Sequence, residues 1–145
     1  MSSEAVQLRF PARAEYLLLA RLAVTGVARR MALGRTEVAD LKLAVTEACS
    51  NVVRHAYSPA GSGEIELELV ASDDRLELVV ADHGTGIALP VPASPEPSER
   101  GGMGFAIIRA VVDELEVGPG RDGGTVLHMT KLARGKERFD HRSGV

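Results

Sequence analysis

Residues 64–69 alternate strictly between glutamate and aliphatic side chains, and this pattern limits the possible folds more than any other feature of the chain. Glutamate stands at positions 64, 66 and 68, with Ile65, Leu67 and Leu69 between them. Because successive side chains of a β-strand point to opposite faces, this strand has one charged and one apolar face. Residues 75–81 repeat a strand pattern after a Ser-Asp-Asp turn. The two segments therefore predict a hairpin in a sheet that is covered on one face only.

The other periodic segments predict helices and short strands. Aliphatic residues recur at helical spacing over residues 14–31 and 36–57, and a shorter helix is expected over 103–113. Further strands are expected at residues 6–10, 115–117 and 125–132. Because the long helices are grouped together and regular βαβ alternation is missing, we predict an α/β (α+β) two-layer sandwich. Its mixed, largely antiparallel sheet would be covered by helices on one face.

The two long helical segments each carry an aliphatic stripe. In the second helix the stripe is expected to be buried and consists of Val38, Leu41, Val45, Ala48 and Val52. In the first helix the recurring aliphatic residues are Leu18, Leu22 and Val27, with Leu19 and Ala23 beside them. Gly34 is expected to end the first helix as a C-cap, and Thr36 to open the second as an N-cap.

Length and composition favour one globular domain at residues 1–133, followed by a polar tail at 134–145. The chain has 145 residues, 45% of them hydrophobic, and a formal net charge of −3. This charge, without interleaved basic and aromatic residues, argues against direct nucleic-acid binding. No apolar run is long enough to span a membrane. The one cysteine, Cys49, fits a reducing compartment and is interpreted as a packing residue, so we expect a cytoplasmic protein.

A carboxylate and an amide lie one helical turn apart in the second helix. Glu47 and Asn51 are separated by four residues, so their side chains project from the same side of the helix. Such a pair can hold a hard cation through oxygen ligands while the carboxylate accepts a proton. Alone, however, this spacing is also typical of a solvated helix face.

Two glycine-containing segments follow. Asp82 ends a strand just before Gly84 and Gly86, which allow the backbone to approach a ligand closely, although a plain turn has the same composition. Residues 101–104, Gly-Gly-Met-Gly, precede a helix whose N-terminus can bind phosphate, although a tight turn is again the alternative. Between them, the proline-rich residues 88–101 are expected to form a lid over a site, although a plain linker is the alternative.

Taken together, the order and spacing of these segments resemble the nucleotide-binding boxes of the GHKL ATPase/kinase superfamily. The matching segments are residues 47–57 (EACSNVVRHAY), 82–86 (DHGTG), 101–105 (GGMGF) and 124–125 (GT). The short chain is most similar to the anti-sigma factor serine kinases of bacterial partner-switching systems. The resemblance covers residues 6–132 and implies a Bergerat-type sandwich with ATP between the helices and the sheet.

The resemblance also implies roles for individual residues. Glu47 would be the catalytic base, Asn51 would coordinate Mg²⁺, Asp82 would accept the adenine amino group, and residues 88–101 would form the ATP lid. The remaining nucleotide contacts that it implies are Gly84, Gly86, Arg100, Gly102, Met103, Gly104, Phe105 and Thr125. His55 is interpreted as a packed histidine and His83 as a loop residue.

Partners follow from the same resemblance. The family binds an RNA polymerase sigma factor and phosphorylates a serine of an anti-anti-sigma antagonist, and its members form homodimers. Arg21 matches a family arginine implicated in partner contact, although an ordinary solvated arginine would look the same. Two alternatives stay open: a docking module that binds nucleotide without transferring phosphate, and the detached ATP-binding half of a histidine kinase. The sequence does not name the sigma factor, the antagonist or the signal.

Overall fold

A computed structural model of the chain describes residues 3–56, 63–84, 103–121 and 123–133. The described residues form a sheet of five strands in the order β1-β2-β3-β5-β4, and every neighbouring pair is antiparallel. The strands are β1 (Glu4–Pro11), β2 (Glu64–Ala71), β3 (Arg75–Asp82), β4 (Glu114–Pro119) and β5 (Thr125–Leu132). The predicted strands are thus all present, β1 and β4 being longer than expected. The expected lid and tail lie outside the described residues.

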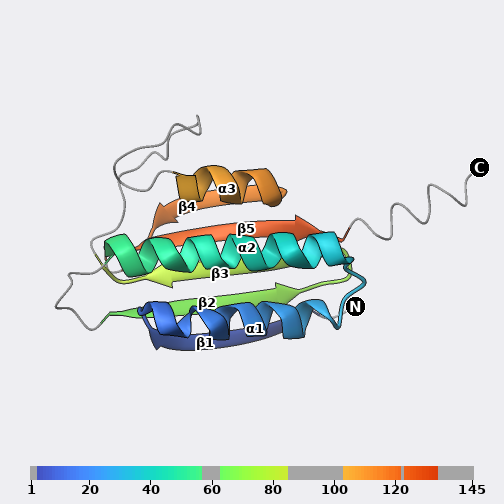
Figure 1. Cartoon of the computed structure of the whole chain (residues 1–145), viewed down its shortest axis with the longest axis horizontal. Helices are drawn as coiled ribbons and strands as arrows, with labels where there is room; N and C mark the ends of the chain where they lie inside the picture. The colour runs from blue at the N-terminus through green and yellow to red at the C-terminus, as the bar shows by residue number, and fades with distance from the viewer. Residues whose placement is uncertain (1–2, 57–62, 85–102, 122, 134–145) are drawn as a thin grey trace, which may run out of the picture.

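The helices cover one face of this sheet, as Figure 1 shows. α1 (Leu17–Ala28) packs against β2, α2 (Arg35–Asn51) against β3 and β5, and α3 (Met103–Val111) against β4. A single 3-10 turn, η1 (Ala14–Tyr16), precedes α1, and a π-helical turn, η2 (Val52–Ala56), extends α2. The predicted two-layer sandwich is therefore confirmed. In the described part of the chain, no helix has the length and apolar character needed to cross a membrane.

The glutamate–aliphatic alternation of β2 determines which face of the sheet is covered. Ile65, Leu67 and Leu69 are almost fully buried beneath the helices, and Leu67 and Leu69 pair with Val80 and Leu78 of β3. Burying each such side chain contributes about 1.5–3 kcal/mol relative to leaving it in water. The glutamates of β2 stay on the opposite, outer face of the sheet, where charges keep their hydration.

α2 supplies the centre of the core. Leu41, Val45 and Ala48 have no exposed surface, and Val52 is 4% exposed, so most of the predicted stripe is buried. Cys49 is also fully buried, and this burial raises the pKa of its thiol to about 12. Since the thiolate is the reactive form of cysteine, Cys49 serves packing, as the sequence indicated.

The first helix faces the core with only part of its aliphatic stripe, because Ala23 and Val27 pack against the core while its leucines at 18, 19 and 22 are exposed. Ala20, Val24 and Ala28 are its buried residues. Leu18 and Leu22 are more than half exposed, at 58% and 56%. The small residues allow α1 to lie close to the sheet, and the larger leucines then project into solvent. The helix is also shorter than expected, ending at Ala28 rather than at residue 31.

The assignment of the caps between α1 and α2 was wrong. Gly34 is the N-cap of α2, not a C-cap of α1, and α2 begins at Arg35, so Thr36 lies inside its first turn. The Gly34 carbonyl accepts the first helical hydrogen bond from the Val38 amide at 3.0 Å. A Cβ atom built on Gly34 would lie 2.9 Å from Glu37 Oε2, so the Glu37 carboxylate folds back over this residue. The bare backbone of Gly34 leaves the room that this carboxylate needs beside the positive end of the helix dipole.

Candidate functional site: the end of α2

Glu47 and Asn51 lie near the C-terminal end of α2, on the side that faces α3. Asn51 is buried with 7% of its surface exposed, whereas Glu47 is only partly buried. The Asn51 Oδ1 atom accepts a hydrogen bond from Arg54 Nη2 at 3.2 Å. Its Nδ2 atom is the one buried side-chain polar atom, among the described residues, that lacks a partner. Because an unpaired buried amide costs free energy, such an atom indicates a place where a ligand or water belongs.

Gly104, in the first turn of α3, keeps the space in front of this pair open. A Cβ atom built on Gly104 would lie 3.1 Å from both Asn51 Nδ2 and Asn51 Oδ1, and 3.4 Å from Glu47 Oε2. Any side chain at this position would therefore fill the room next to the carboxylate and the amide. The predicted residues Glu47, Asn51 and Gly104 are thus brought together, although they come from two different helices.

The turn after β3 packs tightly against the end of η2, the π-helical turn that extends α2. A Cβ atom on Gly84 would overlap with the carbonyl oxygen of Ala56, the last residue of η2. Only a glycine at position 84 allows the π-helical turn and the strand end to approach this closely. π-Helical turns of this kind occur frequently at functional sites. The wide turn therefore ends directly against Gly84, two residues after the end of β3.

Asp82, the last residue of β3, is 3% exposed. Its Oδ1 atom accepts a hydrogen bond from the Gly84 amide at 2.9 Å, which closes a tight turn. A buried carboxylate at the end of a strand can also accept a hydrogen bond from an exocyclic amine of a heteroaromatic ring. The predicted adenine acceptor is therefore placed at the end of the sheet that lies under η2.

Thr125 lies beside Asp82 across the sheet. β3 and β5 pair Ala81 with Val126, so the same register brings Thr125 opposite Asp82, and Thr125 is 2% exposed. A Cβ atom on Gly124 would overlap with the Asp82 carbonyl oxygen, so the glycine preceding Thr125 permits this contact. The predicted segment at residues 124–125 therefore lies next to the predicted segment at residues 82–86.

Not all of the predicted site residues can be placed beside Glu47, Asn51 or Asp82. Met103 begins α3, and Phe105 is partly buried against the hydrophobic core, where its ring supports the helix. Gly86, Arg100 and Gly102 lie outside the described residues. The predicted metal and nucleotide contacts that can be placed therefore come from α2, β3, β5 and the start of α3.

Two other predicted residues lie elsewhere or behave differently. Arg21 is exposed on α1, away from the α2–α3 site, so it belongs to a different surface. His55 is exposed rather than packed, because η2 turns it outward while burying Val52 and Ala56.

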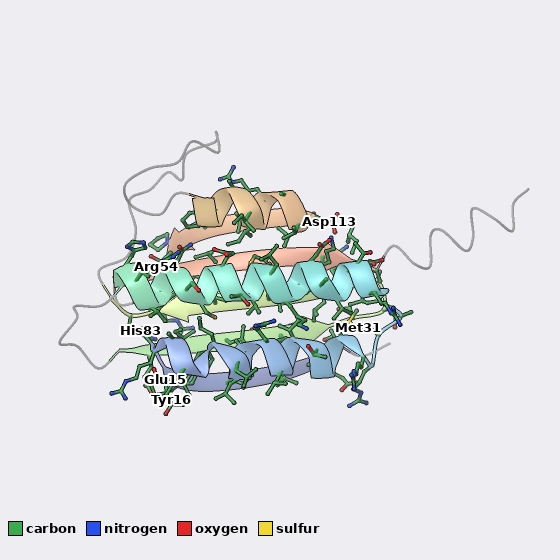
Figure 2. All side chains as sticks on the ribbon, in the orientation of Figure 1. Glu15, Tyr16, Met31, Arg54, His83 and Asp113 are labelled. Atoms are coloured by element: carbon green, nitrogen blue, oxygen red, sulfur yellow. The ribbon has the colours of Figure 1, made fainter. Side chains whose placement is uncertain are left out.

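Arg54 is a site residue that the sequence analysis missed. It lies at the end of the helix layer, and His83 lies at the same end of the molecule (Figure 2). The signal was its position three residues after Asn51, which puts both side chains on one helical face. Its guanidinium adds a positive charge next to the buried amide, where anionic oxygens would be favoured.

These residues fit a nucleotide with a bound divalent cation. An amide oxygen and a nearby carboxylate are hard ligands, and Mg²⁺ commonly takes one or two protein oxygens together with phosphate oxygens and water. The space kept open by Gly104 and the unpartnered Asn51 Nδ2 atom lie next to this ligand set. The Asp82 carboxylate is buried at the end of the sheet, close to the Gly84 turn on which η2 packs.

Comparison with known proteins gives the family. Residues 10–131 match the family described as histidine kinase-like ATPase domain. The chain belongs to this family. The "Serine-protein kinase RsbW" of Bacillus velezensis is 35% identical, over an alignment that covers 99% of this chain and 94% of that protein. The protein of the same name from Bacillus subtilis gives the same identity and coverage. Within the family, the chain therefore belongs with the RsbW-type serine-protein kinases, as the sequence motifs indicated.

Solved structures agree with this fold. The RsbU and RsbW domains of a Mycobacterium tuberculosis protein superpose with a TM-score of 0.67 at 21% identity, covering 89% of this chain and 32% of that one. The histidine kinase domain of a blue-light activated kinase from Erythrobacter litoralis gives a TM-score of 0.56 at 22% identity, covering 89% of this chain and 64% of that one. The Bergerat-type sandwich is thus confirmed.

Proposed function

We propose that this chain is an ATP-dependent serine-protein kinase that also acts as an anti-sigma factor, and that its nucleotide binds over the C-terminal end of α2. The observation that best supports this proposal is the buried Asn51 amide, whose Nδ2 atom lacks a partner beside the Glu47 carboxylate. Gly104 leaves room in front of both groups. Buried side-chain amides in proteins normally have hydrogen-bond partners, so an unpaired one indicates a site for a ligand.

Each placed residue then has a task. Asn51 Oδ1 would bind Mg²⁺, and Arg54, which already lies 3.2 Å from that oxygen, would pair with phosphate. Asp82 would accept a hydrogen bond from the adenine amino group, with Thr125 beside it. The bound Mg-ATP supplies the γ-phosphoryl group. Because phosphoryl transfer depends mainly on alignment and charge neutralisation, residues of these kinds are the minimum set that the reaction requires.

Glu47 would act as the general base. Its carboxylate is partly buried and lies within reach of the space in front of Asn51, so it can accept the proton of an incoming serine hydroxyl. The serine oxygen forms the new bond to the γ-phosphorus, the bond to the β–γ bridging oxygen breaks, and ADP leaves. A positioned base contributes about 10²–10⁴-fold to such a step.

The protein partners are proposed to be an RNA polymerase sigma factor and an anti-anti-sigma antagonist whose serine accepts the phosphate. Added phosphate changes the charge of that antagonist by about −1.5 to −2 and would release it. Arg21 is proposed to contact a partner, and it is flanked on α1 by the exposed Leu18 and Leu22. Contiguous apolar side chains on a surface commonly mark protein contacts.

The domain would include residues 1–133 and would work as a homodimer in the cytoplasm, where ATP and sigma factors are found. Size-exclusion chromatography with light scattering tests this assembly directly. A mass of twice the chain mass of 15.4 kDa supports the dimer, and a mass of one chain contradicts it.

Phosphate transfer from radiolabelled ATP to purified anti-anti-sigma proteins tests the activity. We expect the parent chain to label a serine, and Glu47→Gln to reduce the rate by about 10²–10⁴-fold without weakening ATP binding. Glu68→Gln is the matched control, because Glu68 lies on the outer sheet face, 2.8 Å from Gln7 Nε2. Equal rates for the parent and Glu47→Gln would contradict the base assignment. ATP binding without any transfer by the parent would leave a docking module.

A further inference from the structure

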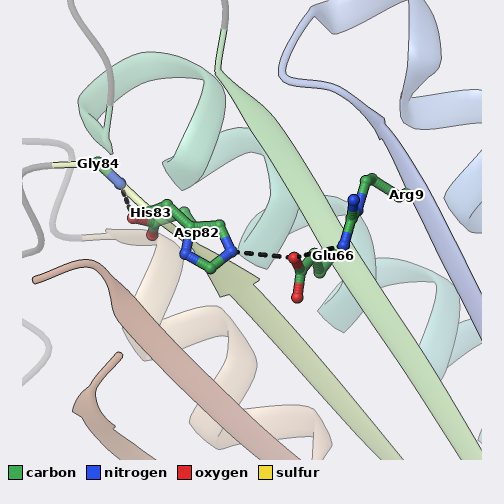
Figure 3. Close-up of polar contacts among 5 residues, drawn as sticks. All are labelled: Arg9, Glu66, Asp82, His83 and Gly84. Atoms are coloured by element: carbon green, nitrogen blue, oxygen red, sulfur yellow. Dashed lines mark hydrogen bonds and ion pairs between the residues drawn. The ribbon is translucent and has the colours of Figure 1, made fainter. Parts of the chain in front are cut away.

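A polar chain on the outer face of the sheet reaches the turn that follows β3 (Figure 3). The His83 Nε2 atom lies 2.9 Å from Glu66 Oε1, and Arg9 Nη2 donates to the same oxygen at 3.2 Å. Arg9 belongs to β1, Glu66 to β2, and His83 directly follows β3, so three adjacent strands are joined. An ionised carboxylate only accepts hydrogen bonds, so His83 Nε2 carries the hydrogen in this contact.

The charge of Glu66 is favoured by this arrangement. The hydrogen bond from His83 and the nearby charges of His83 and Arg9 hold the pKa of the Glu66 carboxyl below its ordinary value. Glu66 therefore stays ionised and available as an acceptor well below neutral pH. The side chains of His83 and Glu66 are about equally exposed, at 40% and 39%, so water screens the attraction between them.

The backbone of His83 forms the centre of the candidate adenine-binding turn. Asp82 Oδ1 accepts from the Gly84 amide across His83 at 2.9 Å. A Cβ atom on Gly124 would lie 2.8 Å from His83 Cα, so the glycine just before β5 packs closely against this residue. Neighbouring side chains point to opposite faces in extended chain. His83 thus anchors the turn on the outer face, while the Asp82 carboxylate is buried at the end of the sheet.

We infer that His83 is a positioning residue for adenine nucleotide, because its bond to Glu66 holds the Asp82–Gly84 turn from the outer face of the sheet. This inference rests on the proposed ATP site. In this role His83 acts by fixing the orientation of the Asp82 carboxylate. Removing either His83 or Glu66 would break the bond between them. The turn could then move, and the hydrogen bond between Asp82 and the adenine base would be misaligned.

The same sheet face contains a matched control. His128 Nε2 lies 3.0 Å from Glu77 Oε1, and these side chains are 40% and 30% exposed. This second pair joins β5 to β3 in the middle of the strands, where His128 is paired with Val79 rather than with the turn. Both pairs have the same chemistry and similar exposure, so they differ mainly in their connection to Asp82.

Calorimetric titration with ATP and Mg²⁺ tests the inference on the full chain. We expect His83→Ala and Glu66→Ala each to weaken ATP affinity by about three- to fivefold, the size of an exposed charge pair. The double variant should be no weaker than Glu66→Ala, because Glu66→Ala already removes the bond from His83 together with the bond from Arg9. His83→Gln, which keeps a side-chain donor, should recover part of the affinity. In kinase assays, KM for ATP should rise while kcat is retained.

The outcomes separate this inference from the proposed function. If the parent binds ATP and His83→Ala binds it equally well, the positioning role is overturned and the ATP site stands. If His128→Ala weakens affinity as much as His83→Ala, the effect is general to the sheet, and the positioning role is again overturned. If the parent binds no ATP, both the proposed function and the positioning role of His83 are overturned. Should His83→Ala fold poorly, Glu66→Ala, which removes the acceptor of the same bond, gives the comparison.

Discussion

The helices α1 and α2 lie side by side on the same face of the sheet, but they use their aliphatic side chains in opposite ways. α2 turns Leu41, Val45 and Ala48 fully into the core and places Glu47 and Asn51 at the site. α1 touches the core with small residues and exposes Leu18 and Leu22. The difference indicates that α2 supplies most of the core packing and the site residues, whereas α1 supplies an exposed apolar surface.

The core side of α2 is fully buried at Leu41. Leu41→Ala should lower the free energy of unfolding by about 2–5 kcal/mol, because it leaves a cavity in a fully packed region. Urea denaturation followed by circular dichroism measures the change. A loss below about 1 kcal/mol would mean that the core relaxes around the gap, and α2 would not be the stabilising helix.

A smaller effect is expected where α2 meets the sheet end. Gly84→Ala puts a Cβ atom onto the Ala56 carbonyl oxygen and should cost about 1–3 kcal/mol, the usual range for overpacking. It should also weaken ATP binding, since the Asp82 turn must shift. Gly118→Ala is a suitable control, because nothing lies within 4 Å of a Cβ atom built there. Equal stability of the two variants would show that η2 does not press on Gly84.

The smallest effect on stability is expected on α1. Leu22→Ala should change the free energy of unfolding by no more than about 0.5 kcal/mol, because this side chain is 56% exposed and fills no buried space. The same variant should weaken binding of the sigma factor or the antagonist in a pull-down assay with purified partners. A large loss of stability with unchanged partner binding would reverse the roles assigned to the two helices.

The sequence predicted the parts of the fold whose pattern has one physical solution. The strict alternation around Leu67 permits only a strand with one covered face, and the stripe around Leu41 and Val45 permits only one buried helix side. α1 is rich in aliphatic residues on more than one side, so periodicity alone did not determine which side meets the sheet. The small residues Ala20 and Val24 decided this through close packing, which depends on the partner surface.

The candidate site was predictable in its residue types but not in its geometry. Spacing placed Glu47 and Asn51 on one helix side, yet the burial of Asn51 depends on α3 packing against α2, which no local pattern contains. The bond from Arg54 to Asn51 likewise depends on the path of η2. The cap at Gly34 was missed because Thr36 is a favourable N-cap by type, whereas the Glu37 carboxylate needs the space of a glycine one turn earlier.

We propose that the end of α2 holds Mg-ATP. Calorimetric titration of the parent chain and of Asn51→Ala, with ATP and with or without Mg²⁺, tests it most directly. We predict Mg-dependent ATP binding by the parent and loss of the Mg-dependent part in Asn51→Ala, while the unfolding transition of both remains cooperative. ATP affinity in Asn51→Ala equal to that of the parent in the presence of Mg²⁺ would contradict the metal assignment, and absence of binding by the parent would contradict the site itself.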